Sequence, residues 1–113
     1  MDQENAIEAL AALAQSSRMS VFRLLVNQGP TGLTATEIST QLQIVASTLS
    51  GHLGILKRAG LLSATRQSRE IHYAANLETI NRLMLFLLAD CCGGQLENCS
   101  DILTLLSDKP GNC

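Results

Sequence analysis

The sequence predicts a mainly α-helical domain with one small β-hairpin, and three observations carry this prediction. Apolar residues recur at helical spacing in five segments between Asn5 and Cys92. The segment at residues 61–74 instead shows two runs that favour strands, separated by a polar turn. Capping residues and breakers, such as NQGPTG at residues 27–32, divide these segments. The chain of 113 residues, 46% of them hydrophobic, suffices for one domain with an aliphatic core.

The first two helices are expected near the N-terminus. One spans Asn5–Ala14, and the next runs from Ser17 to about Asn27 with Ser16 or Ser17 as its N-cap. Apolar side chains at helical spacing are Ile7, Leu10, Ala11 and Ala14 in the first helix, and Val21, Leu24 and Leu25 in the second.

A short third helix is predicted by a capping box. Thr34 and Glu37 have the required spacing, in which each side chain accepts a hydrogen bond from the other residue's backbone N–H. The helix then continues to Gln41 or Leu42. Ile38 and Leu42 lie four residues apart, so both should face inward.

The fourth helix follows the tight turn QIV. It runs from Ala46 to about Ala59, and Gly60 stands where a left-handed C-cap belongs. One face carries Leu49, Leu53 and Leu56. The opposite face begins with small polar residues where an ordinary surface helix carries long charged ones, which suits close approach to another surface.

A β-hairpin and a long apolar helix complete the order. The strands are Leu61–Arg66 and Ile71–Ala74, joined by the polar sequence QSRE. Asn76 can cap the last helix, which ends at Cys91-Cys92-Gly93-Gly94. Its apolar residues are Leu77, Ile80, Leu83, Met84, Leu85, Phe86, Leu87 and Leu88. Because so apolar a terminal helix needs a partner beyond its own core, we expect a homodimer.

This order of elements is that of a winged helix-turn-helix. In that fold the second helix of the motif enters the major groove of double-stranded DNA, and the hairpin contacts phosphate or the minor groove. Hydroxyl groups near the start of the entering helix can contact base edges, a glycine lets the backbone come close, and basic side chains contact phosphates. The candidate DNA-binding residues are Ser47, Thr48, Ser50, Gly51, His52, Lys57, Arg66 and Arg69.

The charge distribution favours this interpretation more than the total charge does. The net charge is −2, but the segment Ser47–Tyr73 carries four Lys and Arg residues against Glu70 alone. A chance cluster on a solvated face is the competing explanation, and polar residues at a helix start are often simple caps. The order of the elements decides in favour of DNA binding.

Several other classes of protein fit poorly. The N-terminus MDQENAIEAL is acidic, unlike a signal peptide, and the apolar run LMLFLLA is far shorter than the ~20 residues that cross a bilayer. We therefore expect a cytoplasmic protein without membrane contact. Both histidines, His52 and His72, lie in the DNA-binding half, so no base stands near a thiol nucleophile, and we expect neither an enzyme nor an organic cofactor. A plain dimerisation or adaptor module would not need the small-residue face or the arginine-tipped hairpin.

The sequence resembles the ArsR/SmtB family of arsenic- and metal-responsive repressors from about Leu10 to Cys92. The resemblance lies in LAQSSRMSVFRLL, STLSGHLGILKRAGLL and ATRQSREIHYAAN, of which the second is the most specific. It implies a winged-helix homodimer that joins through its first and last helices. It also implies repression by occupying an operator, relieved when an inducer binds.

The chain departs from the family pattern at several positions. Val45 stands where a small capping residue is usual, and Gly51 where a basic or larger residue is common. The short third helix begins TATE without the cysteine pair of many arsenic-responsive members. The last helix lacks the histidine ligands of zinc-responsive members. Both familiar sensing sites are therefore absent.

The cysteines at the end of the chain are the remaining candidates for sensing. We expect a winged-helix and dimerisation domain at residues 1–92 and a cysteine-containing tail at residues 93–113. Soft thiolates select soft ions, and arsenite takes three sulfurs in a pyramid. Cys91, Cys92 and Cys99 could supply them, since Gly93-Gly94 lets the backbone bend. Some arsenic-responsive relatives carry a similar pair and third cysteine after the last helix. Arsenite or antimonite is thus the expected inducer.

Other uses of these cysteines stay open. Methylarsenite needs two sulfurs, so Cys91 and Cys92 alone could bind it. Zinc or cadmium could recruit Cys113 as a fourth ligand, although the spacing matches no zinc ribbon. A disulfide from the pair to Cys99 would make a redox sensor, whereas one within the pair is disfavoured because adjacent Cα atoms are only ~3.8 Å apart. The thiols could also be inert.

Overall fold

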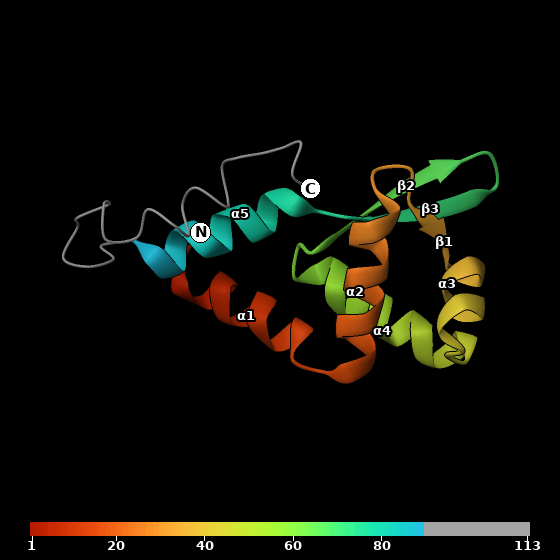
Figure 1. Ribbon diagram of the computed structural model, residues 1–113, viewed down its shortest axis with the longest axis horizontal. Helices are drawn as coiled ribbons and strands as arrows, with labels where there is room; N and C mark the ends of the chain where they lie inside the picture. Colours follow the sequence, from red (N-terminus) through yellow and green to blue (C-terminus); the bar gives the residue numbers. More distant parts are fainter. Residues whose placement is uncertain (90–113) are drawn as a thin grey trace.

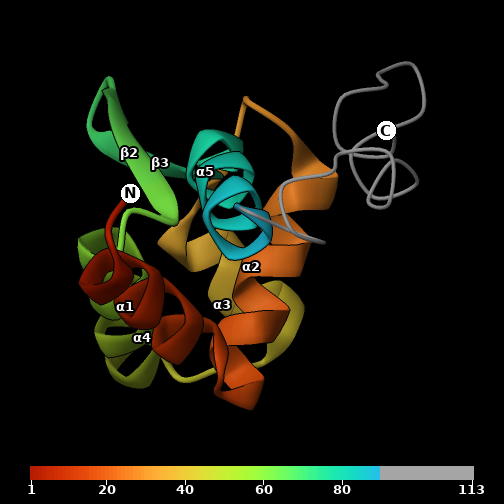
Figure 2. The same cartoon turned by 90° about the vertical axis from the view of Figure 1, so that its left-hand side faces the viewer.

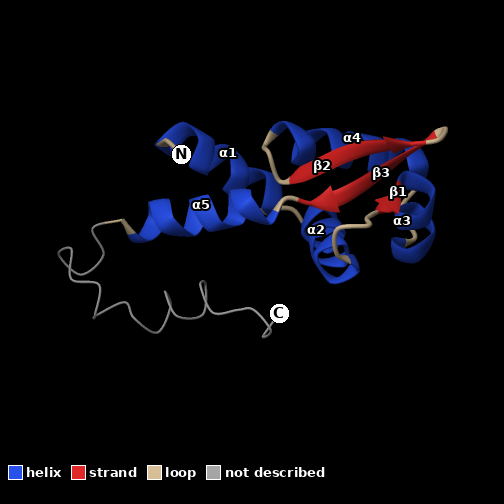
Figure 3. Ribbon diagram, turned by 90° about the horizontal axis from the view of Figure 1, so that it is seen from above, coloured by secondary structure: helices blue, strands red, loops and turns tan. Residues whose placement is uncertain are grey.

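The computed structural model of the protein describes residues 1–89 as five helices and a three-stranded antiparallel sheet. The elements are α1 (Gln3–Leu13), α2 (Ser16–Gln28), β1 (Leu33–Thr34), α3 (Ala35–Leu42), α4 (Ala46–Arg58), β2 (Leu62–Gln67), β3 (Glu70–Ala75) and α5 (Leu77–Leu88). α1 and α5 lie side by side at one end, and α3 and the β2–β3 hairpin lie at the other (Figure 1 and Figure 3). The predicted mainly helical fold is confirmed.

Aliphatic side chains from the helices and from the start of the hairpin form the core. The largest fully buried ones are Val21, Leu25, Ile38, Leu49, Leu56, Leu61 and Leu83. Leu49, Leu53 and Leu56 are at most 3% exposed, which confirms that the leucine face of α4 packs inward. Burial of such side chains, at roughly 1.5–3 kcal/mol each, fixes which face of α4 is left for solvent.

Helix caps follow the prediction at α3 and after α4, where Gly60 has a left-handed φ of 82°, and differ at α2 and α5. The Oγ1 of Thr34 accepts a hydrogen bond from the backbone N–H of Glu37 at 3.2 Å, and Glu37 accepts one from the backbone N–H of Thr34 at 2.9 Å. The capping box is therefore confirmed. The prediction of Ser16 or Ser17 as the cap of α2 is wrong, because the side chain of Gln15 accepts from Arg18 N instead. Asn76 occupies the N-cap position of α5 but makes no side-chain hydrogen bond there.

The sheet contains a strand that the sequence did not predict. β1 pairs antiparallel with β3, with Leu33 opposite Tyr73, in the strand order β1-β3-β2. Two residues are too few to show alternation, so only the pairing with β3 defines this strand. Gly32, at φ 72°, makes the close approach possible, because a Cβ there would lie 2.4 Å from the carbonyl oxygen of Tyr73. Each hairpin strand extends one residue further toward the turn than predicted, so Ser68 and Arg69 alone connect them.

α1 packs through its alanines rather than through its larger residues. Ala6, Ala9 and Ala12 are at most 3% exposed, whereas Ile7 is 56% and Leu10 is 43% exposed. Small side chains let the helix axis come close to the core. Ile7 and Leu10 are consequently left exposed, on a helix that lies beside α5 (Figure 2).

Candidate DNA-binding interface

The start of α4 presents small polar side chains to solvent, as predicted. Ser47, Thr48, Ser50 and Gly51 are exposed, while Leu49 between them is 1% exposed. The N-cap residue, Val45, makes no side-chain hydrogen bond to the first turn and is 70% exposed. The backbone N–H groups of this turn are thus left without a side-chain cap, and such groups favour an approaching phosphate.

Gly51 creates room that the fold itself does not require. A Cβ built at this position meets no atom within 4 Å, and the residue lies in the interior of a regular helix. Alanine would therefore fit, and it favours a helix by roughly 0.5–1 kcal/mol over glycine. The absence of a side chain accordingly leaves open space on the outer face of α4.

His52 is held at the edge of the α4 face by a contact with α2. Its ring is partly buried, and its Nδ1 lies 3.4 Å from Nη1 of Arg18. The Nε of the same arginine donates a hydrogen bond to the carbonyl oxygen of Ala12, at the end of α1, at 2.6 Å. Arg18 was not among the predicted site residues, since a contact 34 positions away leaves no local signal.

The predicted basic residues are exposed and unneutralised within the described part of the chain. Lys57 lies in the last turn of α4, Arg66 near the end of β2, and Arg69 in the turn of the hairpin. The ion pairs among residues 1–89 are Arg82 with Glu78 and His72 with Glu70, and none includes these three cations. Their charges are therefore available to the phosphates of a nucleic acid.

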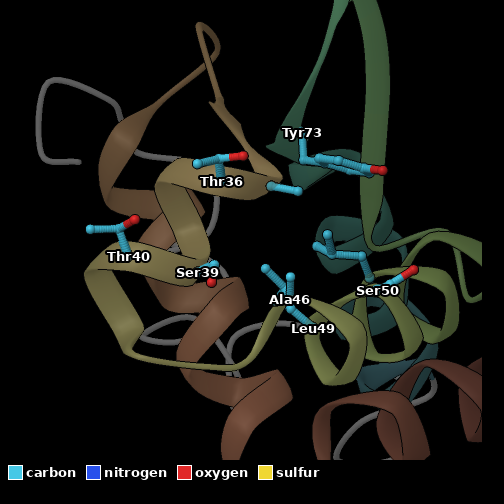
Figure 4. Close-up of a pocket in the computed structure, with 9 residues that line it drawn as sticks. Thr36, Ser39, Thr40, Ala46, Leu49, Ser50 and Tyr73 are labelled. Carbon is cyan, nitrogen blue, oxygen red and sulfur yellow. The ribbon is translucent and has the colours of Figure 1, made fainter.

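A groove between α3, α4 and the sheet adds residues that the sequence did not point to. It has a volume of about 190 Å³, and the hydroxyl-bearing side chains at its edge include Thr36, Thr40, Ser50 and Tyr73 (Figure 4). The Oγ of Ser39 donates to the carbonyl oxygen of Ile44 at 2.6 Å and so stabilises the turn between the two helices. The helix-turn-helix order predicted from the sequence could have indicated the hydroxyls of α3. Tyr73 lies on β3, and its place at the groove depends on how the sheet packs beside α3.

The end of the molecule away from this surface is apolar. Leu77, Leu85 and Leu87 of α5 are each 50–57% exposed, and Leu83 is the residue of this helix that is buried. Ile7 and Leu10 of α1 are also exposed, and we call the exposed apolar side chains of these two neighbouring helices together the α1–α5 face. Exposure of this kind is typical of a protein–protein contact.

The predicted thiol site lies outside the described residues, as does the predicted domain boundary after Cys92. Within residues 1–89, no group of three or more His, Cys, Asp or Glu residues is arranged to hold a metal ion. The helices in this range are all too short or too polar to cross a membrane.

The chain is similar to known transcriptional regulators. Residues 13–63 match a helix-turn-helix domain family. The uncharacterised helix-turn-helix-type transcriptional regulator YbzH of Bacillus subtilis (strain 168) is 30% identical over 93 residues, which cover 72% of this chain and 93% of YbzH.

Solved structures of transcriptional regulators have a similar fold. The transcriptional repressor PagR of Bacillus anthracis is 28% identical, with a TM-score of 0.60 over 74% of this chain and 93% of PagR. The homodimeric winged helix-turn-helix DNA-binding domain of Mb0332 from Mycobacterium bovis, a possible ArsR-family regulator, has a TM-score of 0.63 at 20% identity, over 95% of this chain and 89% of the other.

The fold and the exposed face of α4 define a winged helix-turn-helix DNA-binding domain. The chain belongs to the helix-turn-helix transcriptional regulators.

Proposed function

We propose that the protein is a homodimeric repressor that occupies an operator in double-stranded DNA and is released by a thiophilic ion, arsenite above all. The DNA-binding part of this proposal is carried by the exposed start of α4. It has small polar residues and a glycine, Gly51, with no atom near its Cβ position, and the hairpin adds arginines that form no ion pair within the described residues. Hydroxyls reach base edges, and the cations bind phosphates. PagR, a repressor similar in sequence, supports the direction of regulation.

The α1–α5 face supports the homodimer. Two copies joined there would cover Ile7 and Leu10 of α1 together with the exposed leucines of α5. The two copies of α4, which we call the reading helices, would then begin toward the outer ends of the dimer, since the adjoining α3 and the hairpin lie opposite this face (Figure 1). Such a dimer reads two half-sites about one helical turn, ~34 Å, apart. The homodimeric state of Mb0332 supports a homodimer.

For the sensing step we propose that Cys91, Cys92 and Cys99 bind arsenite or antimonite. The support is chemical: three thiolates match the three exchangeable oxygens of arsenite. Cys91 also stands three positions after Leu88, where α5 ends earlier than the sequence predicted, and α5 is the helix that would join the dimer. Binding there would change the relative placement of the two reading helices. Release of DNA requires that the ion bind the free dimer better than the DNA-bound one, typically by ~1–3 kcal/mol.

Selection of duplexes from a random pool tests DNA binding. The selected site is then titrated with wild type, Thr48→Ala and Ser50→Ala at one fixed salt concentration. We expect weaker binding by both variants, with relaxed preference at individual base pairs. Unchanged affinity and preference in both would remove α4 from the interface.

Single Cys→Ser variants test the inducer site. Cys91→Ser, Cys92→Ser and Cys99→Ser should each abolish DNA release by arsenite without altering DNA affinity, while Cys113→Ser serves as the matched control. A full response in all three variants would refute the site. The responses to arsenite, antimonite, methylarsenite, zinc, cadmium and a thiol oxidant are then compared to distinguish the possible inducers. An ion that needs three sulfurs should lose its effect on Cys99→Ser, whereas an ion that needs only two should keep it.

A further inference from the structure

We infer that Arg18 is a positioning residue for DNA binding, which fixes the tautomer of His52 so that its Nε2–H faces a DNA phosphate. The inference rests on the proposed function, because it assumes that α4 enters the groove. The contact between Arg18 and His52 exists in the free protein, so the tautomer of His52 and its contact with DNA can be tested separately.

The first step is the direction of the hydrogen bond between the two side chains. Nη1 of Arg18 lies 3.4 Å from Nδ1 of His52. A guanidinium only donates, so Nδ1 must be the acceptor. In a neutral imidazole the single proton then resides on Nε2. A contact with α2 therefore decides which nitrogen of this reading-helix residue donates a hydrogen bond.

The second step is that Nε2 is free to make an outside contact. Among residues 1–89, Nε2 of His52 has no hydrogen-bond partner, and the same range holds no buried side-chain nitrogen or oxygen that lacks one. The atom is consequently not fully buried. His52 lies one helical turn after Thr48, on the side of α4 that faces α2, so its donor lies at the edge of the reading face. Phosphates line the edges of the groove that a reading helix enters, and an N–H at the edge fits a phosphate oxygen.

The third step is that Arg18 is itself held in place. Its Nε donates to the carbonyl oxygen of Ala12 in the last turn of α1 at 2.6 Å, and its backbone N–H donates to Gln15 at 2.9 Å. The guanidinium thus joins the end of α1 to the middle of α4. Because α1 forms part of the α1–α5 face, Arg18 links the helix of that face to His52.

The tautomer is measured in the protein without DNA. Long-range ¹H–¹⁵N correlation spectra of the imidazoles are recorded for wild type, Arg18→Met and Arg23→Met. Arg23 is an exposed arginine on the same helix and serves as the charge-matched control. The chain has two histidines, so His52→Gln assigns the signals. We expect Nδ1 of His52 to be unprotonated in wild type and in Arg23→Met, with mixed tautomers in Arg18→Met. A protonated Nδ1 in wild type, or identical spectra in all three, would overturn the inference.

Binding to a selected duplex tests the phosphate contact. The amide of asparagine can replace Nδ1 but not Nε2, whereas that of glutamine can reach the position of Nε2. We expect His52→Asn to weaken binding about tenfold, as for loss of a hydrogen bond to a charged group, and His52→Gln to weaken it less. Arg18→Met should resemble His52→Asn, and the double variant should be no weaker than His52→Asn.

The salt dependence separates this contact from an ionic one. A neutral donor releases no counterion, so the slope of log affinity against log salt should be the same in wild type and His52→Asn, whereas Lys57→Ala should reduce it by about 0.9. Wild-type affinity in His52→Asn, or additive losses in the double variant, would refute the inference. If wild type itself shows no specific duplex binding, the proposed function fails, while the spectra still decide the tautomer.

Discussion

Replacement of Gly51 by alanine should make the protein more stable and a poorer DNA binder. The new Cβ meets no atom of residues 1–89 within 4 Å, so no strain opposes the change. Glycine inside a helix is less favourable than alanine by roughly 0.5–1 kcal/mol. Each kcal/mol corresponds to a rise of about 4–8 °C in Tm for a domain of 60–100 residues. The same methyl group would occupy the space through which DNA approaches, and overpacking of a close contact costs about 1–3 kcal/mol, or tenfold in affinity per 1.4 kcal/mol.

Two measurements test the opposed effects. Denaturant unfolding is followed at one fixed protein concentration, because the stability of a homodimer depends on concentration. Duplex binding is followed by fluorescence anisotropy at one fixed salt concentration. Gly54→Ala is the control, since its Cβ would make only an ordinary 3.7 Å contact with Arg58 on the same helix. We expect a similar gain in stability from Gly54→Ala without the loss in affinity.

Each outcome bears on a separate part of the reasoning. A gain in stability with unchanged DNA affinity would remove Gly51 from the interface. A loss of stability would contradict the open space at its Cβ. Equal losses of affinity in both variants would show that the effect arises from α4 as a whole and not from close approach at one position.

Three further predictions, two of them with a second variant for comparison, test other parts of the structure. Val45→Thr adds the missing N-cap of α4 and should raise the free energy of unfolding by about 1 kcal/mol, whereas Thr34→Ala removes the cap of α3 and should lower it by a similar amount. If Thr34→Ala has the expected effect but Val45→Thr does not stabilise the protein, the N-cap assignment of α4 is wrong. Gly32→Ala should lower it by about 1–3 kcal/mol, because φ is 72° and the Cβ would collide with a carbonyl of β3; denaturant unfolding at wild-type level would be the contrary result. Leu85→Glu should yield monomers in analytical ultracentrifugation, while Ile71→Glu, at an exposed apolar residue of the hairpin, should leave the dimer intact; dimers in both would place the interface elsewhere.

Local patterns sufficed to predict most helices of this fold. The capping box at Thr34 and Glu37 lies within four residues, so it defines the start of α3 without any tertiary contact. The leucine face of α4 follows from helical periodicity, because three large side chains on one side must be buried. The exposed small residues opposite it were predictable for the same reason.

Other features depend on segments far apart in the chain. Periodicity marked Ile7 and Leu10 as part of the apolar stripe of α1, yet Ala6, Ala9 and Ala12 are the buried residues. α1 has apolar residues on several faces. The face that packs inward depends on how closely the neighbouring helices approach, and the local sequence pattern does not determine this distance between helices. The exposed stripe then becomes part of the α1–α5 face, which the periodicity alone could not distinguish from core.

The sequence by itself determined the winged helix-turn-helix order, the basic hairpin, and the reading helix with Ser47, Thr48, Ser50 and Gly51. Each of these features follows from the local spacing of residues, from capping or from charge. Only the tertiary structure decided the pairing of β1 with β3, the inward face of α1 and the contact of Arg18 with His52. These depend on hydrogen bonds and packing between distant segments. Their partners are chosen by the three-dimensional arrangement of the elements and leave no mark in the sequence around either residue.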